Sequence, residues 1–473
     1  MATPIDPQSL AFFLAESRNM PIHVGGLLLF EKPDDAGDDY VRRLYEEQLL
    51  TDRLNPLFAK RPHRSLATAG QWVWTEDENF DIEHHVRHSA LPSPGRIREL
   101  LDLTSRLHGQ RLASDRPLWE THLIEGLADG RIAMYTKIHH ALVDGVSAMR
   151  LLSSSFSPDP DQRGMKPPFA WQEKAPREAR ERSRSDHAKA LAEIPPSAIR
   201  STLAAIADAA GLPGATLKSL GNSLALPKAG PVSFAAPKTI LNQRITGARR
   251  FAADDWSFER LKRVGNATGT TMNDVLLAMN GGALRAYLED LNALPDTSLV
   301  SMVPVGLNAK QSGIASTAGG NAVGTLMVRL GTELADPADR LQSIHESMAA
   351  GKEMMASMTK SQIMAMAGLG MAPSMLTPLL RLNSVVNPPF NITISNVPGP
   401  KQPMYYNGAK LVGMYPASVP MHGQALNVTA VSYNGQVGLG LTGCRRTVPH
   451  LQRLLVHLED ALVDLERAAG VQS

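Results

Sequence analysis

A polar, proline-rich segment in the middle of the chain is the feature that most limits its possible folds. The segment begins near residue 159 and ends near residue 238. On both sides of it, strand-like alternation is mixed with the helical spacing of apolar residues. The sequence therefore predicts two mixed α/β halves, at 1–158 and 239–473, joined by a partly helical linker at 159–238.

The length of the chain supports this division, because 473 residues exceed the size that one hydrophobic core usually serves. A hydrophobic fraction of 43% and a charged fraction of 20% are typical of a globular protein. The net charge of +2 argues against a dedicated nucleic-acid binder, so we expect no nucleic-acid partner. No run of about 18 apolar residues predicts a transmembrane helix.

Two further features bear on where the protein works. The N-terminal residues lack the basic and apolar regions of a signal peptide. Cys444 is the single cysteine, which excludes an intramolecular disulfide and fits a reducing compartment. We therefore expect a cytoplasmic protein.

The most reactive-looking pattern is an H-H-x-x-x-D-G motif that ends a predicted strand. Asp129-Gly130 is a hairpin-turn dipeptide, and apolar and polar residues alternate after it as far as His140. In this alternation His140 continues the mostly apolar face, whereas His139 lies on the opposite face. Helical spacing begins at Gly145. A strand end before a loop is a place where catalytic side chains are often held.

The chemistry of the motif favours His140 as a general base, with His139 supporting it. Neutral imidazole is available near neutral pH, because its ordinary pKa is about 6.5. Asp144 has two possible roles, either to orient the imidazole directly or to brace the loop through a buried arginine pair, and its spacing does not decide between them. The non-catalytic alternative is a pair of strand-end histidines followed by an Asp-Gly turn.

The second half contains a helix start with two polar residues in its first turn. The spacing predicts a helix over 272–290 with Thr271 as its N-cap, so Asn273 and Asp274 lie at its beginning. An acidic residue there suits the helix dipole. The amide of Asn273 is a candidate donor to a developing oxyanion. We take both as active-site candidates.

Two segments are candidates to line an apolar substrate. Seven methionines lie between residues 354 and 375, and their flexible, polarizable side chains suit variable apolar ligands. Met355 and Met358 are our candidates among them, and a core helix pair is the alternative. Asn396 lies where two prolines and a glycine interrupt a strand predicted at 391–395, in either a rigid turn or a substrate-lining loop.

Two other patterns receive structural interpretations. Trp119, in Pro117-Leu118-Trp119, is predicted to be a buried anchor at the entry to the strand pair that leads to the two histidines. His84 and His88 invite a metal site, but no third ligand has matching spacing and Arg87 opposes a cation. The sequence therefore predicts no metal.

Taken together, these residues resemble the bacterial wax ester synthase/diacylglycerol acyltransferase family. The likeness extends from near residue 8 to about residue 465. H-H-x-x-x-D-G alone is shared with chloramphenicol acetyltransferases, carnitine acyltransferases, plant acyltransferases and peptide-synthetase condensation domains, so the specificity comes from the joint set: His139 to Gly145, Pro117-Leu118-Trp119, Asn273-Asp274 and Asn396 to Pro400. One departure is Cys444-Arg445-Arg446, at a place where such sequences often carry an acidic residue.

The resemblance implies an α/β fold with mixed sheets, built as two chloramphenicol-acetyltransferase-like halves with an active-site tunnel between them. It places His140 at the middle of the tunnel and makes Asp144 a structural brace of the motif. It implies direct transfer from acyl-CoA to a long-chain alcohol, giving a wax ester, or to diacylglycerol, giving triacylglycerol. No cofactor or metal is expected, since acyl-CoA is a substrate.

Water-insoluble substrates lead us to expect peripheral contact with membrane or lipid droplets. Two other functions fit the same fold. One is a condensation-type acyltransferase that uses a carrier-bound acyl group. The other is a non-catalytic lipid-binding protein.

Overall fold

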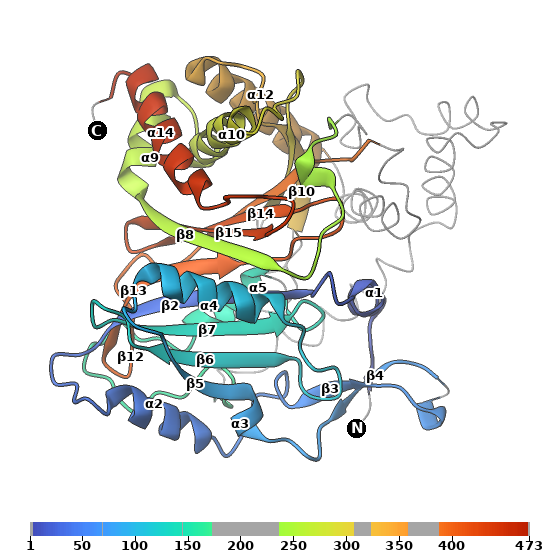
Figure 1. Cartoon of the computed structure of the whole chain (residues 1–473), viewed down its shortest axis with the longest axis vertical. Coiled ribbons are helices and arrows are strands. Elements are labelled where there is room, and N and C mark those ends of the chain that lie inside the picture. The colour runs from blue at the N-terminus through green and yellow to red at the C-terminus, as the bar shows by residue number, and fades with distance from the viewer. Residues whose placement is uncertain are drawn as a thin grey trace.

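The computed structural model describes residues 3–68, 70–143, 145–172, 236–306, 323–357 and 387–471. In these ranges the chain forms two six-stranded sheets and one three-stranded sheet. Figure 1 shows the two large sheets one above the other, with α4 between them and further helices on the outer faces. The described residues therefore form the mixed α/β architecture that the sequence predicts, with each half centred on one large sheet.

The first large sheet has the order β12-β13-β2-β7-β6-β5 and is antiparallel except for the parallel pair β5–β6. Its strands are β2 (His23–Glu31), β5 (Val86–Ala90), β6 (Trp119–Glu125), β7 (Ile132–His139), β12 (Tyr405–Tyr406) and β13 (Ala409–Ala417). Both faces of β7 are buried, and each face packs into an apolar cluster that includes helix residues. The site histidines follow directly from the end of this strand.

The second large sheet has the order β10-β9-β11-β14-β15-β8 and is mixed, because β11 runs parallel to both of its neighbours. Its strands are β8 (Arg249–Ser257), β9 (Val300–Gly306), β10 (Val323–Arg329), β11 (Ile392–Pro398), β14 (Leu426–Tyr433) and β15 (Gln436–Cys444). Four helices pack over it: α9 (Phe258–Thr268), α10 (Met272–Asp290), α12 (Pro337–Ala356) and α14 (Arg453–Ala468). Their apolar faces form the largest core cluster of the described chain.

The remaining elements surround the first sheet. The small sheet has the order β1-β4-β3, with β1 (Thr3–Pro4), β3 (Lys60–His63) and β4 (Val73–Glu76). The helices are α1 (Pro7–Ala15), α2 (Tyr40–Leu49), α3 (Ile82–His85), α4 (Ile97–Gly109) and α5 (Gly145–Ser153), and two short 3₁₀ helices span Leu66–Thr68 and Ile240–Asn242. Helix α4 also contacts the second large sheet, because Ser105 Oγ accepts a hydrogen bond from the backbone N–H of Phe251 in β8 at 2.8 Å.

The helix predicted over 272–290 is confirmed to the residue, as is its N-cap, because Thr271 Oγ1 accepts from the backbone N–H of Asp274. The strand predicted at 391–395 was too short, since β11 continues to Pro398. Among the described residues β11 pairs with β9 only at Ile392 and Thr393. A proline is tolerated near a strand end that pairs on one side only, because the missing N–H then costs no ladder bond.

The chain does not keep its two halves separate in the sheets. Strands β12 and β13 follow the predicted linker in sequence, yet β13 pairs antiparallel with β2 in the first sheet. This pairing joins the halves along a ladder that runs from Lys410 to Ala417, with one register shift between Leu411 and Gly413. The boundaries at 158 and 239 stay a prediction, because most of the predicted linker, residues 173–235, lies outside the described residues.

No helix within the described ranges is long and apolar enough to cross a membrane.

Candidate active site

The two motif histidines occupy different environments at the end of β7. His139 is the last residue of the strand and is fully buried, whereas His140 follows it and is partly exposed. The backbone N–H of His140 donates to the carbonyl of Ile22 at 3.0 Å, which holds the chain beside β2. The ring of Phe12 lies against the His140 ring, with 4.6 Å between centroids. Of the two, His140 is therefore the imidazole that a substrate can approach.

His139 is held in one protonation state by its surroundings. Its Nδ1 accepts a hydrogen bond from the backbone N–H of Ala141 at 3.0 Å, so a neutral ring carries its proton on Nε2. Burial, together with the neighbouring His140 and Arg111, lowers the pKa of His139 to about 3. The ring is therefore neutral near neutral pH, which fits a supporting role for His139 in the motif.

Gly145 begins α5, as the sequence predicts, and is partly exposed. Met149 and Leu152 of the same helix are buried against the first sheet. Asp144 lies outside the described residues. Whether it braces the motif or contacts the base stays a prediction.

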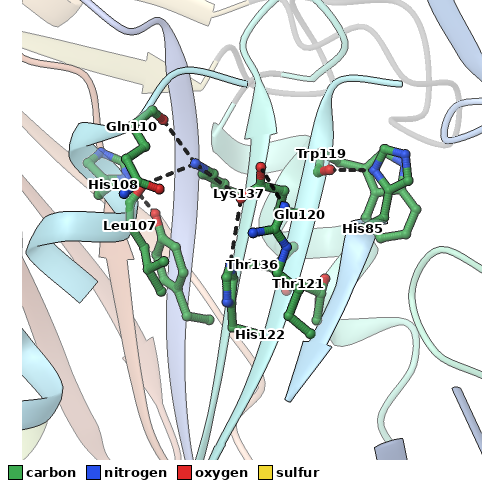
Figure 2. A network of polar contacts seen from close by, with 12 residues as sticks. His85, Leu107, His108, Gln110, Trp119, Glu120, Thr121, His122, Thr136 and Lys137 are labelled. Carbon is green, nitrogen blue, oxygen red and sulfur yellow. Dashed lines mark hydrogen bonds and ion pairs between the residues drawn. The ribbon is translucent and has the colours of Figure 1, made fainter. Parts of the chain in front are cut away.

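A buried lysine two residues before His139 ties β7 to the end of α4. Figure 2 shows Lys137 between the two elements. Its Nζ donates to the backbone carbonyls of Leu107 at 3.0 Å and Gln110 at 2.9 Å, and lies 3.3 Å from Glu120 Oε2. A cation suits the C-terminal end of a helix, where carbonyls lack partners. Lys137 thus fixes the strand that delivers the two histidines.

Glu120 of β6 is the anion at the centre of this network. Besides Lys137, it lies 3.5 Å from His122 Nε2 and 3.8 Å from Arg87. Burial would raise the pKa of Glu120, but the close contact with His122 and the charges of Lys137 and Arg87 outweigh it and lower the pKa to about 2. The sequence showed Lys137 only as a neighbour of His139 on one strand face, and no pattern marked it as buried.

A second polar cluster joins α4, β2 and β7 below the motif. The Nδ1 of His108 accepts from the hydroxyl of Tyr135 at 2.7 Å, and its Nε2 donates to the carbonyl of Ser418 at 2.8 Å. The Nε2 of His23 donates to the backbone carbonyl of His108 at 2.9 Å. Burial lowers the pKa of His108 to about 3. Sequence reasoning missed these histidines, because their spacing carries no catalytic or metal-binding signal.

In the second half, the structure brings together two asparagines that the sequence had proposed separately. Asn396 Nδ2 donates to Asn273 Oδ1 at 3.4 Å. Both line a pocket of about 210 Å³, whose other walls come from Val303, Pro304, Val305, Met348 and Lys352. Because Asn273 Oδ1 accepts this bond, its Nδ2 group is the part of the amide that can donate to a ligand. No described contact links either asparagine to the motif histidines.

Asp274 points into the helix start instead. It is fully buried, and its Oδ2 accepts from the backbone N–H of Thr271 at 2.9 Å and lies 2.8 Å from His345 Nδ1. The bond to Thr271, with the reciprocal bond from the Asp274 N–H to Thr271 Oγ1, forms a capping box that satisfies backbone donors at the beginning of α10. The other carboxylate oxygen, Oδ1, is buried and has no hydrogen-bond partner among the described residues.

The structure describes one of the two candidate methionines. Met355 of α12 is buried in the core cluster of the second half, which agrees with the core alternative for this residue. Met358 lies outside the described residues. Met348, two turns earlier on the same side of α12, lines the pocket, although it precedes the methionine-rich segment that the sequence singled out.

The two structural interpretations can also be checked. Trp119 is fully buried, donates from Nε1 to the carbonyl of Phe58 at 2.9 Å and stacks on His85 and Phe169, so its predicted anchoring role is confirmed. His84 lies in α3 and His88 lies in β5, so the two do not share a helical face. In the described ranges, no group of three His, Cys, Asp or Glu side chains could hold a metal ion.

Comparison with known proteins covers almost the whole chain. The model of the wax ester synthase/diacylglycerol acyltransferase catalytic domain matches residues 5–276, and that of the WS/DGAT C-terminal domain matches residues 319–466. A Mycobacterium tuberculosis H37Rv protein named as a probable diacylglycerol O-acyltransferase is 47% identical over 98% of this chain and 99% of its own. A second protein of that strain, named as a putative enzyme of the same kind, is 45% identical over 99% and 100%.

Solved structures give the same picture. The wax ester synthase/diacylglycerol acyltransferase of Marinobacter aquaeolei VT8 is 40% identical, with a TM-score of 0.77 over 99% of this chain and 100% of that one. The first condensation domain of the CDA synthetase has a TM-score of 0.58 over 100% and 97%, at 16% identity. The second likeness shows a shared fold alone.

Proposed function

The chain belongs to the wax ester synthase/diacylglycerol acyltransferase family, and from this premise we propose that it is an acyl-CoA-dependent O-acyltransferase. The acyl group is transferred to the hydroxyl of diacylglycerol, giving triacylglycerol, or of a long-chain alcohol, giving a wax ester. The mycobacterial relatives, named as diacylglycerol O-acyltransferases, favour the first acceptor. The name of the Marinobacter enzyme includes both activities.

The observation that carries the proposal is the partly exposed imidazole of His140, placed directly after a rigid, fully buried strand. A general base has to reach the substrate hydroxyl, and its orientation has to be fixed before the reaction. The backbone bond to Ile22 and the ring of Phe12 supply that fixation. His139 is buried and neutral, so it supports the turn and does not itself meet the substrate.

In the proposed reaction, both substrates are bound at the same time. His140 takes the hydroxyl proton while the oxygen attacks the thioester carbonyl, giving a tetrahedral oxyanion. Asn273 is the candidate donor that stabilises the oxyanion. The C–S bond then breaks, and the protonated His140 returns the proton to the CoA thiolate. The products are the ester and CoA. The proposed reaction passes through no acyl-enzyme and uses no metal or cofactor.

The place of action is part of the proposal. Long-chain alcohols and diacylglycerol partition into membranes and lipid droplets, so the protein has to meet them at such a surface. We expect a peripheral association, in which the protein sediments with membranes or floats with droplets and is released by washing. Cell fractionation with an antibody against the chain tests this, and a protein that remains entirely in the high-speed supernatant contradicts it.

A competition assay tests the function and its acceptor. Purified protein receives palmitoyl-CoA with equal amounts of hexadecanol and dipalmitoylglycerol, and the two esters are separated and quantified. CoA release is followed with a thiol reagent in parallel. The single cysteine, Cys444, is fully buried and adds no fast background to the thiol signal. Ester formation that disappears in His140→Ala supports the proposal.

Two outcomes would favour the alternatives. Acyl transfer only from a phosphopantetheinylated carrier would indicate a condensation-type enzyme, a class that shares the fold at 16% identity. No His140-dependent thiol release from any acyl donor would indicate a non-catalytic lipid-binding protein.

A further inference from the structure

One face of the short helix α1 contacts three consecutive residues of the motif. Ser9, Phe12, Phe13 and Glu16 are spaced three and four residues apart, the spacing that places side chains on one side of a helix. Ser9 Oγ donates to the carbonyl of Ala141 at 2.9 Å. Nothing in the motif patterns of the sequence marks this segment.

Each of the two phenylalanines on this face contacts the ring of one motif histidine. Phe12 lies against His140, with 4.6 Å between ring centroids and 33° between the ring planes. Phe13 stacks on His139 at 4.7 Å and 11°. The aromatic contacts limit the rotation of both imidazoles.

Glu16, which caps the C-terminal end of α1, adds the only carboxylate to this set. Its side chain is 6% exposed. Its Oε1 accepts from the backbone N–H of Ile22 at 3.2 Å, and its Oε2 accepts from Arg111 at 2.9 Å. The carbonyl of the same Ile22 receives the N–H of His140. Glu16 therefore acts on the backbone segment that holds the candidate base.

The same carboxylate also faces His139. The distance from Glu16 Oε1 to His139 Nε2 is 3.7 Å, which is longer than a hydrogen bond, so the carboxylate acts on the neutral ring as a charge acts on an N–H dipole. The Nε2 atom is buried and has no hydrogen-bond partner among the described residues. Because Nδ1 accepts from Ala141, the proton is on Nε2 and is directed at the anion. The two contacts favour the same tautomer.

We propose that Glu16, anchored by Arg111, is a positioning residue that holds His139 in the Nε2–H tautomer and thereby fixes the turn that carries His140. In the other tautomer, an Nδ1–H would oppose the N–H of Ala141 and an unprotonated Nε2 would face a carboxylate. Both changes push the turn away from its position beside β2. The expected effect on kcat rests on the proposed function. The expected tautomer of His139 rests only on the contacts described above.

Three variants test the role of Glu16. Glu16→Ala removes the carboxylate and the bond to Ile22, and we expect kcat to fall about 100-fold with the KM for palmitoyl-CoA within about twofold, because misplacement of a catalytic group costs about this much. Glu16→Gln keeps an acceptor oxygen, so we expect it to recover about tenfold of that loss. Glu466→Gln is the matched control, since Glu466 is equally buried and pairs with Arg260 at 2.8 Å in the other half.

A spectroscopic measurement separates positioning from general loss of structure. The tautomer of His139 is read from the nitrogen chemical shifts of ¹⁵N-histidine-labelled protein, assigned by the signal that disappears in His139→Gln. We expect the Nε2–H form in the wild type and in Glu466→Gln, and a mixture of tautomers in Glu16→Ala.

The kinetic role of Glu16 and its effect on the tautomer of His139 are tested separately. Unchanged kcat in Glu16→Ala overturns the proposal, and so does a fall in kcat with His139 still wholly in the Nε2–H form. A wild-type protein without acyltransferase activity refutes the proposed function instead, and the nitrogen shifts then still decide whether Glu16 sets the tautomer.

Discussion

Asn396 in β11 donates a hydrogen bond to Asn273 in the first turn of α10, with 3.4 Å between Nδ2 and Oδ1. The pair joins a strand of the second sheet to a helix that packs over it. Since its Oδ1 is engaged, Asn273 presents an oriented Nδ2 donor in the pocket that both residues line. An oriented donor stabilises a developing oxyanion better than a mobile one, because no reorganisation is needed during the reaction.

The first prediction concerns this donor. We expect Asn273→Ala to lower kcat about 10²–10³-fold with a small change in KM, the effect of removing one oxyanion donor. Asn396→Ala removes only the residue that orients the amide, so its loss should be smaller. Steady-state kinetics with palmitoyl-CoA and the preferred acceptor measure both. If the two variants raise KM and leave kcat unchanged, Asn273 binds substrate and does not stabilise the oxyanion.

The second prediction compares the motif histidines. His140→Ala should lower the rate of ester formation by at least about 10²–10⁴-fold, the usual contribution of a general base. The thermal unfolding midpoint should change less than in His139→Ala, because the residue His140 is partly exposed and His139 is fully buried. His139→Ala should fold but unfold at a lower temperature, since it opens space in a fully buried position. Full activity of His140→Ala would exclude it as the base.

The sequence predicted local structure and motif position well, because both are written in short patterns. The N-cap Thr271 and the helix after it follow from one capping residue and a 3.6-residue period. The strand that leads to the motif follows from alternation after a turn dipeptide, although it ends at His139, one residue before the predicted end at His140. Such signals are complete within about 20 residues.

Contacts between distant segments could not be predicted in the same way. The pairing of β13 with β2 depends on backbone hydrogen bonds that any two strands can form, so neither strand marks its partner. The contact of Glu16 with the motif also joins residues more than one hundred positions apart. The sequence does not distinguish a buried lysine from an exposed one, so the burial of Lys137 could not be predicted. Its partners, Glu120 and two helix-end carbonyls, are brought together only by the fold.

The third prediction tests the buried ion pair of Lys137 and Glu120. Lys137→Met should reduce the free energy of unfolding by about 3–5 kcal/mol, because it leaves a largely buried carboxylate without its nearest cation. Adding Glu120→Gln should restore part of the loss. Arg42→Met breaks an exposed pair with Glu46 and serves as the control, with a much smaller expected effect because solvent screens this pair. Urea unfolding measures all three, and equal effects of Lys137→Met and Arg42→Met would show that burial does not matter here.

The fourth prediction concerns the single thiol. Cys444 is fully buried, and its Sγ accepts from the backbone N–H of Thr246 at 3.4 Å. We expect the native protein to resist iodoacetamide and Cys444→Ala to keep full kcat, since the proposed mechanism has no acyl-enzyme. Intact-mass spectrometry before and after treatment, with urea-unfolded protein as the reactive control, measures the first point. Rapid loss of activity on alkylation of the native protein would reopen a covalent route.

The fifth prediction is a loss of stability in acid that comes from buried histidines. Burial lowers the pKa of His85 to about 4 and those of His108 and His139 to about 3, against about 6.5 in the unfolded chain. Between these values the unfolded chain binds more protons than the folded one, so the free energy of unfolding decreases as the pH falls. At pH 5.5, one unit below the unfolded value, each histidine should cost about 1.4 kcal/mol relative to pH 7.5 or above.

Urea unfolding followed by tryptophan fluorescence at pH 7.5, 6.5 and 5.5 measures this dependence. The variant His108→Gln lowers stability at every pH, because it disturbs the bonds to Tyr135 and Ser418. Its free energy of unfolding should nevertheless decrease less between pH 7.5 and pH 5.5 than that of the wild type. The difference between the two decreases should equal the contribution of one buried histidine. Parallel pH curves for the two proteins would mean that His108 does not remain neutral in the folded state, and would contradict the prediction.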